Sequence, residues 1–250
     1  MISHTAVEHP RRRRTDAPPS YQADTQPALS NRVIQTAHSE AIRARINFWI
    51  AFVALVLLMP LMFLIALAVK LTSKGPILYT QARVGLDRRR DITSPSNYQR
   101  IQDLGGMPFR IYKFRSMTVE AEKNSGAVWA AKDDARVTWV GRILRKARLD
   151  ELPQFFNVLK GEMSVVGPRP ERPAIFADLK SQVDNYQIRQ RALPGITGLA
   201  QISQAYDASL DDVRSKVEHD LQYIQHQSIK EDFRIMLKTI PVVLFRRGGW

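Results

Sequence analysis

The chain has 250 residues and carries 37 Lys and Arg against 24 Asp and Glu, a formal net charge of +13. This length allows one sizeable domain with appendages, and a hydrophobic share of 44% excludes a wholly disordered chain. The absence of cysteine excludes disulfides and thiolate metal sites. The excess of cations favours an anionic partner: nucleic acid, anionic lipid or a phosphorylated metabolite.

The first 41 residues differ from the rest. They contain four consecutive arginines, 11–14, and continue as a polar stretch rich in Pro, Ser, Gln and Ala. This composition predicts a disordered, basic cytoplasmic tail. The later apolar run starts too far from the N-terminus, and is too long, for a signal peptide. The arginines either bind anionic lipid or form a solvated charge run, and both interpretations remain open.

An uncharged apolar run extends from Ile46 to Val69. As a helix it would be about 36 Å long, which is enough to cross a bilayer. Pro60 lies near its middle, where it removes a backbone hydrogen bond and bends the helix. Cations flank both ends of the run: Arg43, Arg45, Lys70 and Lys74. Because positive flanks stay on the cytoplasmic side, residues 42–72 are predicted to form a re-entrant helix broken at Pro60. A full crossing is the alternative.

Two strands are predicted next. The first lies within residues 70–85, where a turn at the Gly75-Pro76 breaker leads into the β-rich residues 77–80. Residues 86–106 are polar and basic, and we expect a loop there. Residues 109–115 alternate apolar and basic side chains, which indicates a strand with one wet, cationic face. Lys113 and Arg115 on that face would bind a phosphate or form a solvated sheet edge.

Two helices are predicted around the middle of the chain. The first has apolar residues at helical spacing and ends near Leu149. Asp150 is expected to cap the second, with Pro153 in its first turn and Gly161 at its end.

Asp150 and Glu151 are adjacent carboxylates with cations on both flanks. Arg145 and Arg148 precede them, and Arg169 follows in a stiff Pro-Arg-Pro segment. Capping is the purely structural interpretation of Asp150. The neighbouring cations favour phosphate chemistry instead, because a helix N-terminus stabilises a carboxylate charge and keeps it available as a nucleophile or metal ligand.

Residues 178–250 are predicted to be mostly helical, with an apolar end from 233 to 245 that is closed by Arg246 and Arg247. That end is either an interfacial helix or part of the core. The chain contains no dinucleotide-binding, Walker or zinc motif, and its five histidines show no ligand spacing. The predicted elements make an α/β protein that is mostly helical with a small sheet.

Several short motifs occur together in a characteristic order. They are 75–81 (GPILYTQ), 83–85 (RVG), 112–117 (YKFRSM), 134–138 (DARVT), 149–154 (LDELPQ), 157–164 (NVLKGEMS), 167–170 (GPRP) and 194–198 (PGITG). Each is weak alone. Together they resemble the bacterial sugar transferases, the polyprenyl-phosphate hexose-1-phosphate transferases that begin glycan assembly on a lipid carrier. The resemblance covers about residues 42–245 and is to the small monotopic form of the family.

The resemblance implies a monotopic enzyme on the cytoplasmic face of the bacterial inner membrane. Residues 73–250 would be its cytosolic catalytic domain, with an inserted loop at 86–106 and C-terminal interfacial helices. Its substrates would be a UDP-sugar and undecaprenyl phosphate, and its cofactor Mg²⁺. Asp150 would attack the sugar-bearing phosphate, UMP would leave, and the lipid would take the phosphosugar. Glu151 would bind the metal. The expected phosphate-binding residues are Lys113, Arg115, Arg145, Arg148 and Arg169.

Two features depart from the family pattern. The 86–106 segment is long, where relatives have a short linker, and Met59 precedes Pro60, where relatives commonly have serine. The competing hypotheses are a basic nucleic-acid-binding protein and a non-catalytic membrane-anchored scaffold. The first leaves the apolar run unexplained, so we expect membrane lipids and no nucleic acid among the partners. A homo-oligomer is possible.

Overall fold

The computed structural model describes residues 37–88, 105–119, 121, 134–204 and 209–245. All of them belong to one unit, residues 35–250. The predicted N-terminal tail, most of the predicted 86–106 loop and the pair Arg246-Arg247 lie outside the described residues.

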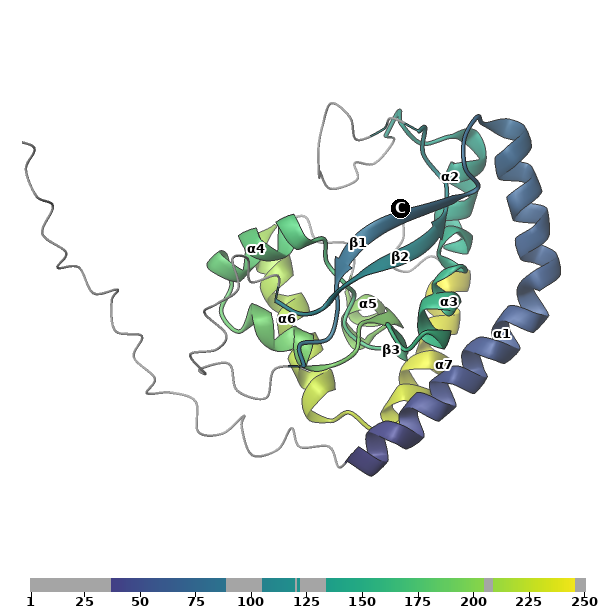
Figure 1. Cartoon of the computed structure of the whole chain (residues 1–250). Helices are drawn as coiled ribbons and strands as arrows, with labels where there is room; N and C mark the ends of the chain where they lie inside the picture. Colours follow the sequence, from purple (N-terminus) through teal and green to yellow (C-terminus); the bar gives the residue numbers. More distant parts are fainter. Residues whose placement is uncertain (1–36, 89–104, 120, 122–133, 205–208, 246–250) are drawn as a thin grey trace, which may run out of the picture. The chain divides into compact units, whose positions relative to one another are not determined.

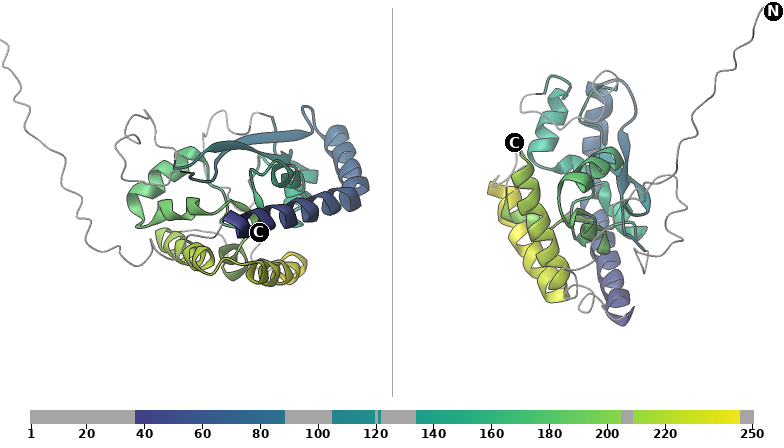
Figure 2. Two further views of the ribbon diagram at one scale, coloured as in Figure 1. Left: turned by 60° about the horizontal axis from the view of Figure 1, so that its bottom comes forward. Right: turned by 90° about the vertical axis from the view of Figure 1, so that its left-hand side faces the viewer.

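A single long helix, α1 (Ala37–Thr72), opens the described part. It has 36 residues, which corresponds to about 54 Å. Its segment 39–72 is long and apolar enough to cross a membrane. Pro60 lies inside it, and the helix continues through this position instead of dividing into the two predicted pieces. Figures 1 and 2 show α1 bent and running along one side of the unit.

The first sheet is an antiparallel pair that connects the end of α1 to the centre of the unit. Strand β1 (Leu78–Val84) pairs with β2 (Pro108–Phe114), in a register that places Tyr79 opposite Lys113 and Val84 opposite Pro108. β1 lies within the predicted segment 70–85, and its ladder to β2 runs from Leu78 to Val84. Lys113 therefore shares a sheet face with alternate residues of β1.

The centre of the unit holds short elements. α2 (Trp139–Lys146) is followed by the 3₁₀ turn η2 (Leu149–Glu151) and by α3 (Gln154–Leu159). β3 (Ser164–Val166) then pairs in parallel with β4 (Gly195–Thr197). α1 packs against α2, α3, β2 and β3, so this apolar helix is joined to the central elements along its length.

Helices form most of the C-terminal part. They are α4 (Pro173–Gln182), the 3₁₀ helix η3 (Tyr186–Arg191), α5 (Leu199–Ser203), α6 (Leu210–Gln225) and α7 (Ile229–Phe245). One apolar core joins β1 to α4, η3 and α6 through residues such as Val84, Phe176 and Val213. A second joins α1, β2 and α2 through Val69, Phe114 and Leu144. The prediction of a mostly helical protein with little sheet is confirmed.

Candidate active site

The two adjacent carboxylates lie in η2, between α2 and α3. Arg148 has a left-handed backbone (φ 55°) that turns the chain after α2, and its carbonyl accepts a hydrogen bond from the Glu151 amide. Asp150 and Glu151 are each only 7% exposed. The prediction that Asp150 caps the following helix is wrong: α3 begins at Gln154 with Pro153 before it, and no side chain caps it. The 3₁₀ turn η2 delays the start of the next helix to Gln154, four residues after Asp150.

Glu151 is held by two cations from distant segments. Lys113 Nζ lies 2.7 Å from its Oε1, and Arg169 Nη2 lies 2.6 Å from the same oxygen. Arg169 Nη1 also donates to Oε2, at 3.4 Å. These contacts bring together three of the residues predicted from the sequence. Asp150, in contrast, accepts no hydrogen bond from the residues that the structure describes.

The pKa values of the two carboxyl groups shift in opposite directions. Burial alone would raise the pKa of Glu151, but the charges and hydrogen bonds of Arg169 and Lys113 outweigh it and hold that pKa well below its ordinary value. Burial raises the pKa of Asp150; the charge of Lys113 opposes this, and the charge of Glu151 adds to it. No α-helix begins at Asp150, so the predicted stabilisation of its charge by a helix N-terminus is absent, and burial raises its pKa instead.

The remaining predicted cations lie in three different settings. Arg145, at the end of α2, is near enough for its charge to lower the pKa of Asp150. The backbone of Arg148 forms the turn described above. Arg115 does not bind at this site. Its guanidinium donates to the carbonyls of Ser73 and Lys74, both at 2.7 Å. The predicted phosphate-binding role of Arg115 is thus corrected to a contact with the end of α1.

Arg169 projects from a segment whose backbone is fixed at four consecutive carbonyls. Pro168 accepts from the Gly195 amide at 2.9 Å, and Glu171 accepts from the Val84 amide at 2.9 Å. Between them, the carbonyls of Arg169 and Pro170 each accept from a guanidinium. The donors are Arg189 and Arg83, both at 3.0 Å. Four separate donors thus hold the backbone that presents Arg169 to Glu151.

Sequence reasoning missed most of this support. Arg83 was noted only as part of a motif, yet burial lowers its pKa to about 10, and the charges of Arg169 and Arg172 lower it as well. Arg189 is fully buried and pairs with Asp220 at 2.7 Å. Spacing along the chain gives no sign of such pairs.

Asp150 and Glu151 could supply the two protein ligands of a Mg²⁺ ion. This ion commonly uses one or two carboxylates together with substrate phosphates and water. Among the described residues no group of three or more His, Asp or Glu could hold a metal, so substrate oxygens would have to complete the shell. Asp150 is the more open ligand, since both oxygens of Glu151 already accept from cations.

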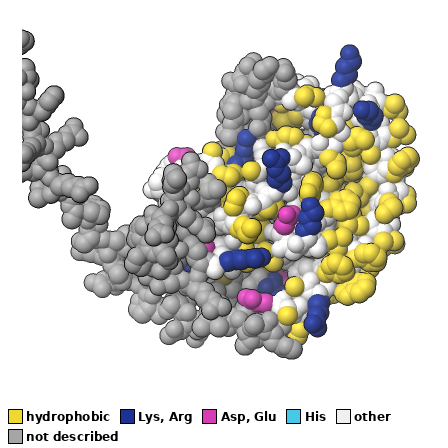
Figure 3. Space-filling model, in the orientation of Figure 1, with side chains coloured by type: hydrophobic (Ala, Val, Ile, Leu, Met, Phe, Trp, Pro, Cys, Tyr) yellow, Lys and Arg dark blue, Asp and Glu magenta, His cyan; other side chains and the backbone are white. Residues whose placement is uncertain are grey.

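Cationic side chains gather on the face of the unit seen in Figure 3, over β1 and β2. Lys113 and Arg83 come from these strands. The arrangement is a buried carboxylate pair with fixed positive charges around it, which suits nucleophilic attack on a phosphate ester with charge stabilisation of the leaving group.

Comparisons with known proteins agree with this chemistry. The chain is 42% identical over 208 residues to the UDP-N-acetylgalactosamine-undecaprenyl-phosphate N-acetylgalactosaminephosphotransferase of Aeromonas hydrophila, covering 83% of the chain and 45% of the relative. It is 43% identical over 188 residues to the UDP-glucose:undecaprenyl-phosphate glucose-1-phosphate transferase of Klebsiella pneumoniae, covering 74% of the chain and 36% of the relative. The chain thus spans less than half the length of these two relatives.

A shorter relative is covered more fully. The putative undecaprenyl-phosphate N-acetylgalactosaminyl 1-phosphate transferase of Bacillus subtilis is 41% identical over 155 residues, which cover 62% of the chain and 76% of the relative. The family model described as bacterial sugar transferase matches residues 38–246, a range that includes all but the first residue of α1, the carboxylate pair and all of the cations around it. The chain belongs to the bacterial sugar transferase family.

Proposed function

We propose that the protein transfers a sugar-1-phosphate from a UDP-sugar to undecaprenyl phosphate and releases UMP. This would be the first membrane step of exopolysaccharide, capsule, O-antigen or glycoprotein glycan synthesis. The names of the relatives describe sugar phosphate transfer involving undecaprenyl phosphate. The observation that carries the proposal is the contrast within the carboxylate pair: Glu151 is held by two cations, and its neighbour Asp150 accepts no hydrogen bond from the described residues.

Asp150 is the nucleophile in this proposal. Its carboxylate oxygen attacks the phosphorus that bears the sugar; a P–O bond to Asp150 forms as the bond to UMP breaks, and UMP leaves with the electron pair. An oxygen of undecaprenyl phosphate then attacks the same phosphorus and releases Asp150. Lys113, Arg145 and Arg169 stabilise the negative charge that develops on the phosphoryl oxygens. A phosphoryl-aspartate divides one difficult displacement into two.

Mg²⁺ is part of the proposal, with Glu151 and Asp150 as its protein ligands. When bound, it would neutralise charge on the diphosphate. The protein's own contribution is to hold Glu151 ionised and fixed. Lys113 and Arg169 do both, because each donates to its carboxylate.

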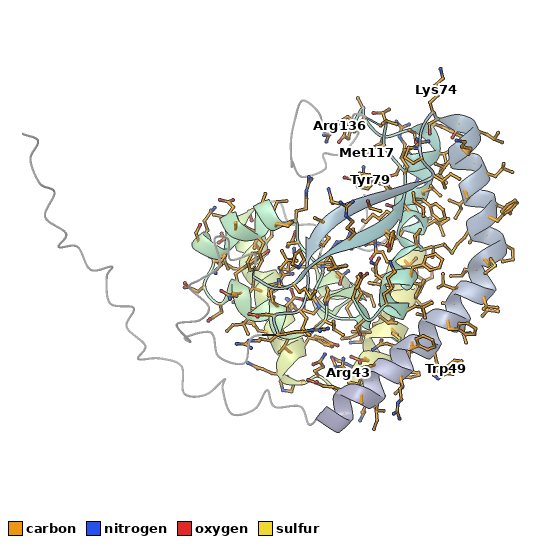
Figure 4. The ribbon with its side chains drawn as sticks, viewed as in Figure 1. Arg43, Trp49, Lys74, Tyr79, Met117 and Arg136 are labelled. Atoms are coloured by element: carbon orange, nitrogen blue, oxygen red, sulfur yellow. The ribbon has the colours of Figure 1, made fainter. Side chains whose placement is uncertain are left out.

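The contacts of α1 support a re-entrant membrane helix. At its beginning, Arg43 pairs with Asp232 of α7 at 2.8 Å, and Asn47 accepts from the Val165 amide at 3.0 Å. At its end, the carbonyl of Ser73 accepts from Arg115. Figure 4 shows Arg43 and Lys74 at the two ends of α1. A full crossing would put the two ends on opposite sides of a hydrocarbon layer about 30 Å thick. One cytosolic unit could not then contact both.

The outer surface of α1 is suited to lipid. Its exposed apolar residues are Phe48, Trp49, Phe52, Val53, Val56, Leu57, Met59, Leu61, Phe63, Leu64, Leu67 and Leu71. Figure 3 shows hydrophobic side chains covering this edge of the unit. α7 adds Phe233, Leu237 and Ile240, which are exposed at helical spacing. Such a helix suits the headgroup region, so we place α1 within one leaflet and α7 at its surface, on the cytoplasmic face of the bacterial inner membrane.

The competing hypotheses of a scaffold and of a nucleic-acid-binding protein gain no support from the comparisons, since the relatives' names describe transferases. A homo-oligomer remains a prediction.

A direct test is UMP release from a panel of UDP-sugars, with and without undecaprenyl phosphate. Without acceptor, the wild type is expected to release about one UMP per enzyme and to retain radioactive sugar phosphate on the protein. Asp150→Asn should do neither while staying folded. Asp211→Asn, a matched change at an exposed position of α6, should behave as the wild type.

Two outcomes would contradict the proposal. If UMP were released only when the acceptor is present, the proposed aspartyl intermediate would be wrong. If no UDP-sugar tested gave transfer to undecaprenyl phosphate, the proposed activity itself would be wrong.

A further inference from the structure

Arg115 connects the end of the membrane helix α1 to β2, the strand that carries Lys113. It directly follows β2 and is only 5% exposed. Its Nη1 donates to the carbonyl of Lys74 at 2.7 Å, and its Nη2 donates to the carbonyl and hydroxyl of Ser73 at 2.7 and 2.8 Å. The carbonyl of Val69, inside the last turn of α1, lies 3.4 Å from Nη2. One guanidinium thus binds the backbone where α1 ends.

A cation is well suited to this position. The last carbonyls of a helix have no partner within the helix and carry the negative end of its dipole. The neighbouring backbone also packs closely against the Arg115 guanidinium. Gly75 has φ +124°, and a Cβ there would lie 2.1 Å from Nη1 of Arg115. Any other residue at 75 would displace the guanidinium.

This connection is close to the carboxylate pair. Lys113, two residues before Arg115, holds Glu151 at 2.7 Å. Phe114 lies between them and packs in one core with Ile65 and Val69 of α1. Leu149 and Leu152, which flank the carboxylate pair, pack against that same core. Figure 4 shows Lys74 just beyond the end of α1, beside the start of the strand that carries Tyr79.

We propose that Arg115 is a positioning residue that fixes the end of α1 to β2 and thereby sets the height of Asp150 above the bilayer. The inference rests on the proposed function, in which the second substrate is a phosphate anchored in the membrane. Such an acceptor cannot adjust its own depth freely, so a tilt of α1 against β2 would separate its phosphate from Asp150. A water-soluble acceptor would be insensitive to the same tilt.

The test compares two acceptors in the full-length protein reconstituted in liposomes: undecaprenyl phosphate, and a short-chain prenyl phosphate that is soluble in water. Arg115→Gln removes the charge and the forked donors. We expect transfer to undecaprenyl phosphate to fall by about 100-fold, the scale of a small misplacement of reacting groups, with transfer to the soluble acceptor within about threefold of the wild type. Arg115→Lys keeps one charged donor and should recover part of the loss.

A second measurement does not depend on activity. A fluorophore on Leu71→Cys, near the end of α1, reports depth through quenching by brominated lipid. Arg115→Gln should change this quenching. Arg110→Gln should alter neither the quenching nor the ratio of the two transfer rates. Arg110 is an exposed arginine on β2 whose side chain, among the residues that the structure describes, donates to the Thr80 hydroxyl at 3.4 Å.

Equal losses with both acceptors, or unchanged quenching in Arg115→Gln, would overturn the proposal and leave Arg115 with a role in stability alone. If Arg115→Gln failed to fold, Arg115→Lys would carry the same comparison. A wild type that transfers to neither acceptor would contradict the proposed function, and the quenching would still decide the role of Arg115.

Discussion

Arg189 donates a hydrogen bond from its Nη2 to the backbone carbonyl of Arg169 at 3.0 Å, although 20 positions separate the two residues. Arg189 is fully buried, and its Nε is paired with Asp220 at 2.7 Å. A buried arginine that binds the backbone of a residue at the carboxylate pair can serve stability, geometry or both. Mutations can distinguish a role in stability from a role in the geometry of the site.

Arg189→Met alone should destabilise the protein by about 3–5 kcal/mol, because it leaves the Asp220 charge buried without a partner. The double variant Arg189→Met, Asp220→Leu removes both charges and should recover most of that stability. Its transfer rate should nevertheless stay about tenfold or more below the wild type, since the Arg169 carbonyl has lost its donor. Thermal unfolding and steady-state kinetics on the same samples check this. Full activity in the double variant would show that Arg189 acts through stability alone.

Arg169 itself should matter most in the transition state. Arg169→Ala is expected to lower kcat by about 100-fold or more, the scale of losing one preorganised donor. Arg169→Lys should restore only part of this, because lysine cannot present the forked donors that reach both oxygens of Glu151. Arg214→Ala, at an exposed position on α6, is the control. A wild-type rate in Arg169→Ala would place the phosphate site elsewhere.

The raised pKa of Asp150 predicts an acid limit to activity. The nucleophile must be ionised, so kcat/KM should fall as the pH falls through a pKa above the ordinary value of 3.8. Glu151 should not contribute to this limb, since its pKa lies below the usual range. In Arg145→Met the limb should move to higher pH, because a charge that lowers the Asp150 pKa is gone. A shift to lower pH would contradict the assignment.

Asn157 is predicted to fix β2 against α3. It is fully buried; its Nδ2 donates to the Arg110 carbonyl and to Glu162, both at 2.7 Å, and its Oδ1 accepts from the Tyr112 amide at 3.1 Å. Asn157→Ala leaves these groups without partners and should cost about 3 kcal/mol of unfolding free energy. Urea unfolding in detergent measures it, with the exposed Gln182→Ala as control. A cost below about 0.5 kcal/mol would fall in the range of ordinary surface changes.

The residues that lie close to the pair were largely predictable from the sequence. Asp150 and Glu151 are adjacent in the chain, so their proximity needs no folding. Lys113 lies in a strand whose alternating apolar and basic residues fix the face on which each side chain lies. Arg169 lies between two prolines that restrict its backbone. The structure joins both of them to Glu151.

The supporting contacts were not predictable, because they depend on packing between distant elements. Arg115 has the same spacing from Lys113 as two residues on one face of a strand, yet β2 ends at Phe114 and Arg115 turns toward α1. Asp150 resembled a helix cap because Pro153 and an apolar run follow it. The 3₁₀ turn at Leu149–Glu151 delays the helix to Gln154. Local patterns cannot rank a cap against such a turn when tertiary contacts decide between them.

The topology of α1 can be tested with single cysteines, because the natural chain has none. Glu40→Cys lies at an exposed position at the start of α1, and Glu218→Cys lies at an exposed position on α6. A re-entrant helix keeps both on the cytoplasmic side, so both should resist a membrane-impermeant thiol reagent in intact cells and react after lysis. Labelling of position 40 in intact cells, with position 218 protected, would mean a full crossing.

The same assay can separate the two features that hold α1 in a re-entrant path. Pro60→Leu restores a backbone donor and removes the cause of the bend, while Arg43→Leu removes the pairing with Asp232 that fixes the start of α1 to α7. Each change alone should raise labelling of Glu40→Cys in intact cells only slightly. The double change should raise it several-fold, because a straight helix of about 54 Å exceeds the hydrocarbon thickness of about 30 Å. Arg234→Leu, an exposed arginine of α7, replaces Arg43→Leu in the control pair and should add nothing to Pro60→Leu. If the double variant stayed protected, the remaining contacts of α1 with α3 and β3 would be sufficient to hold it.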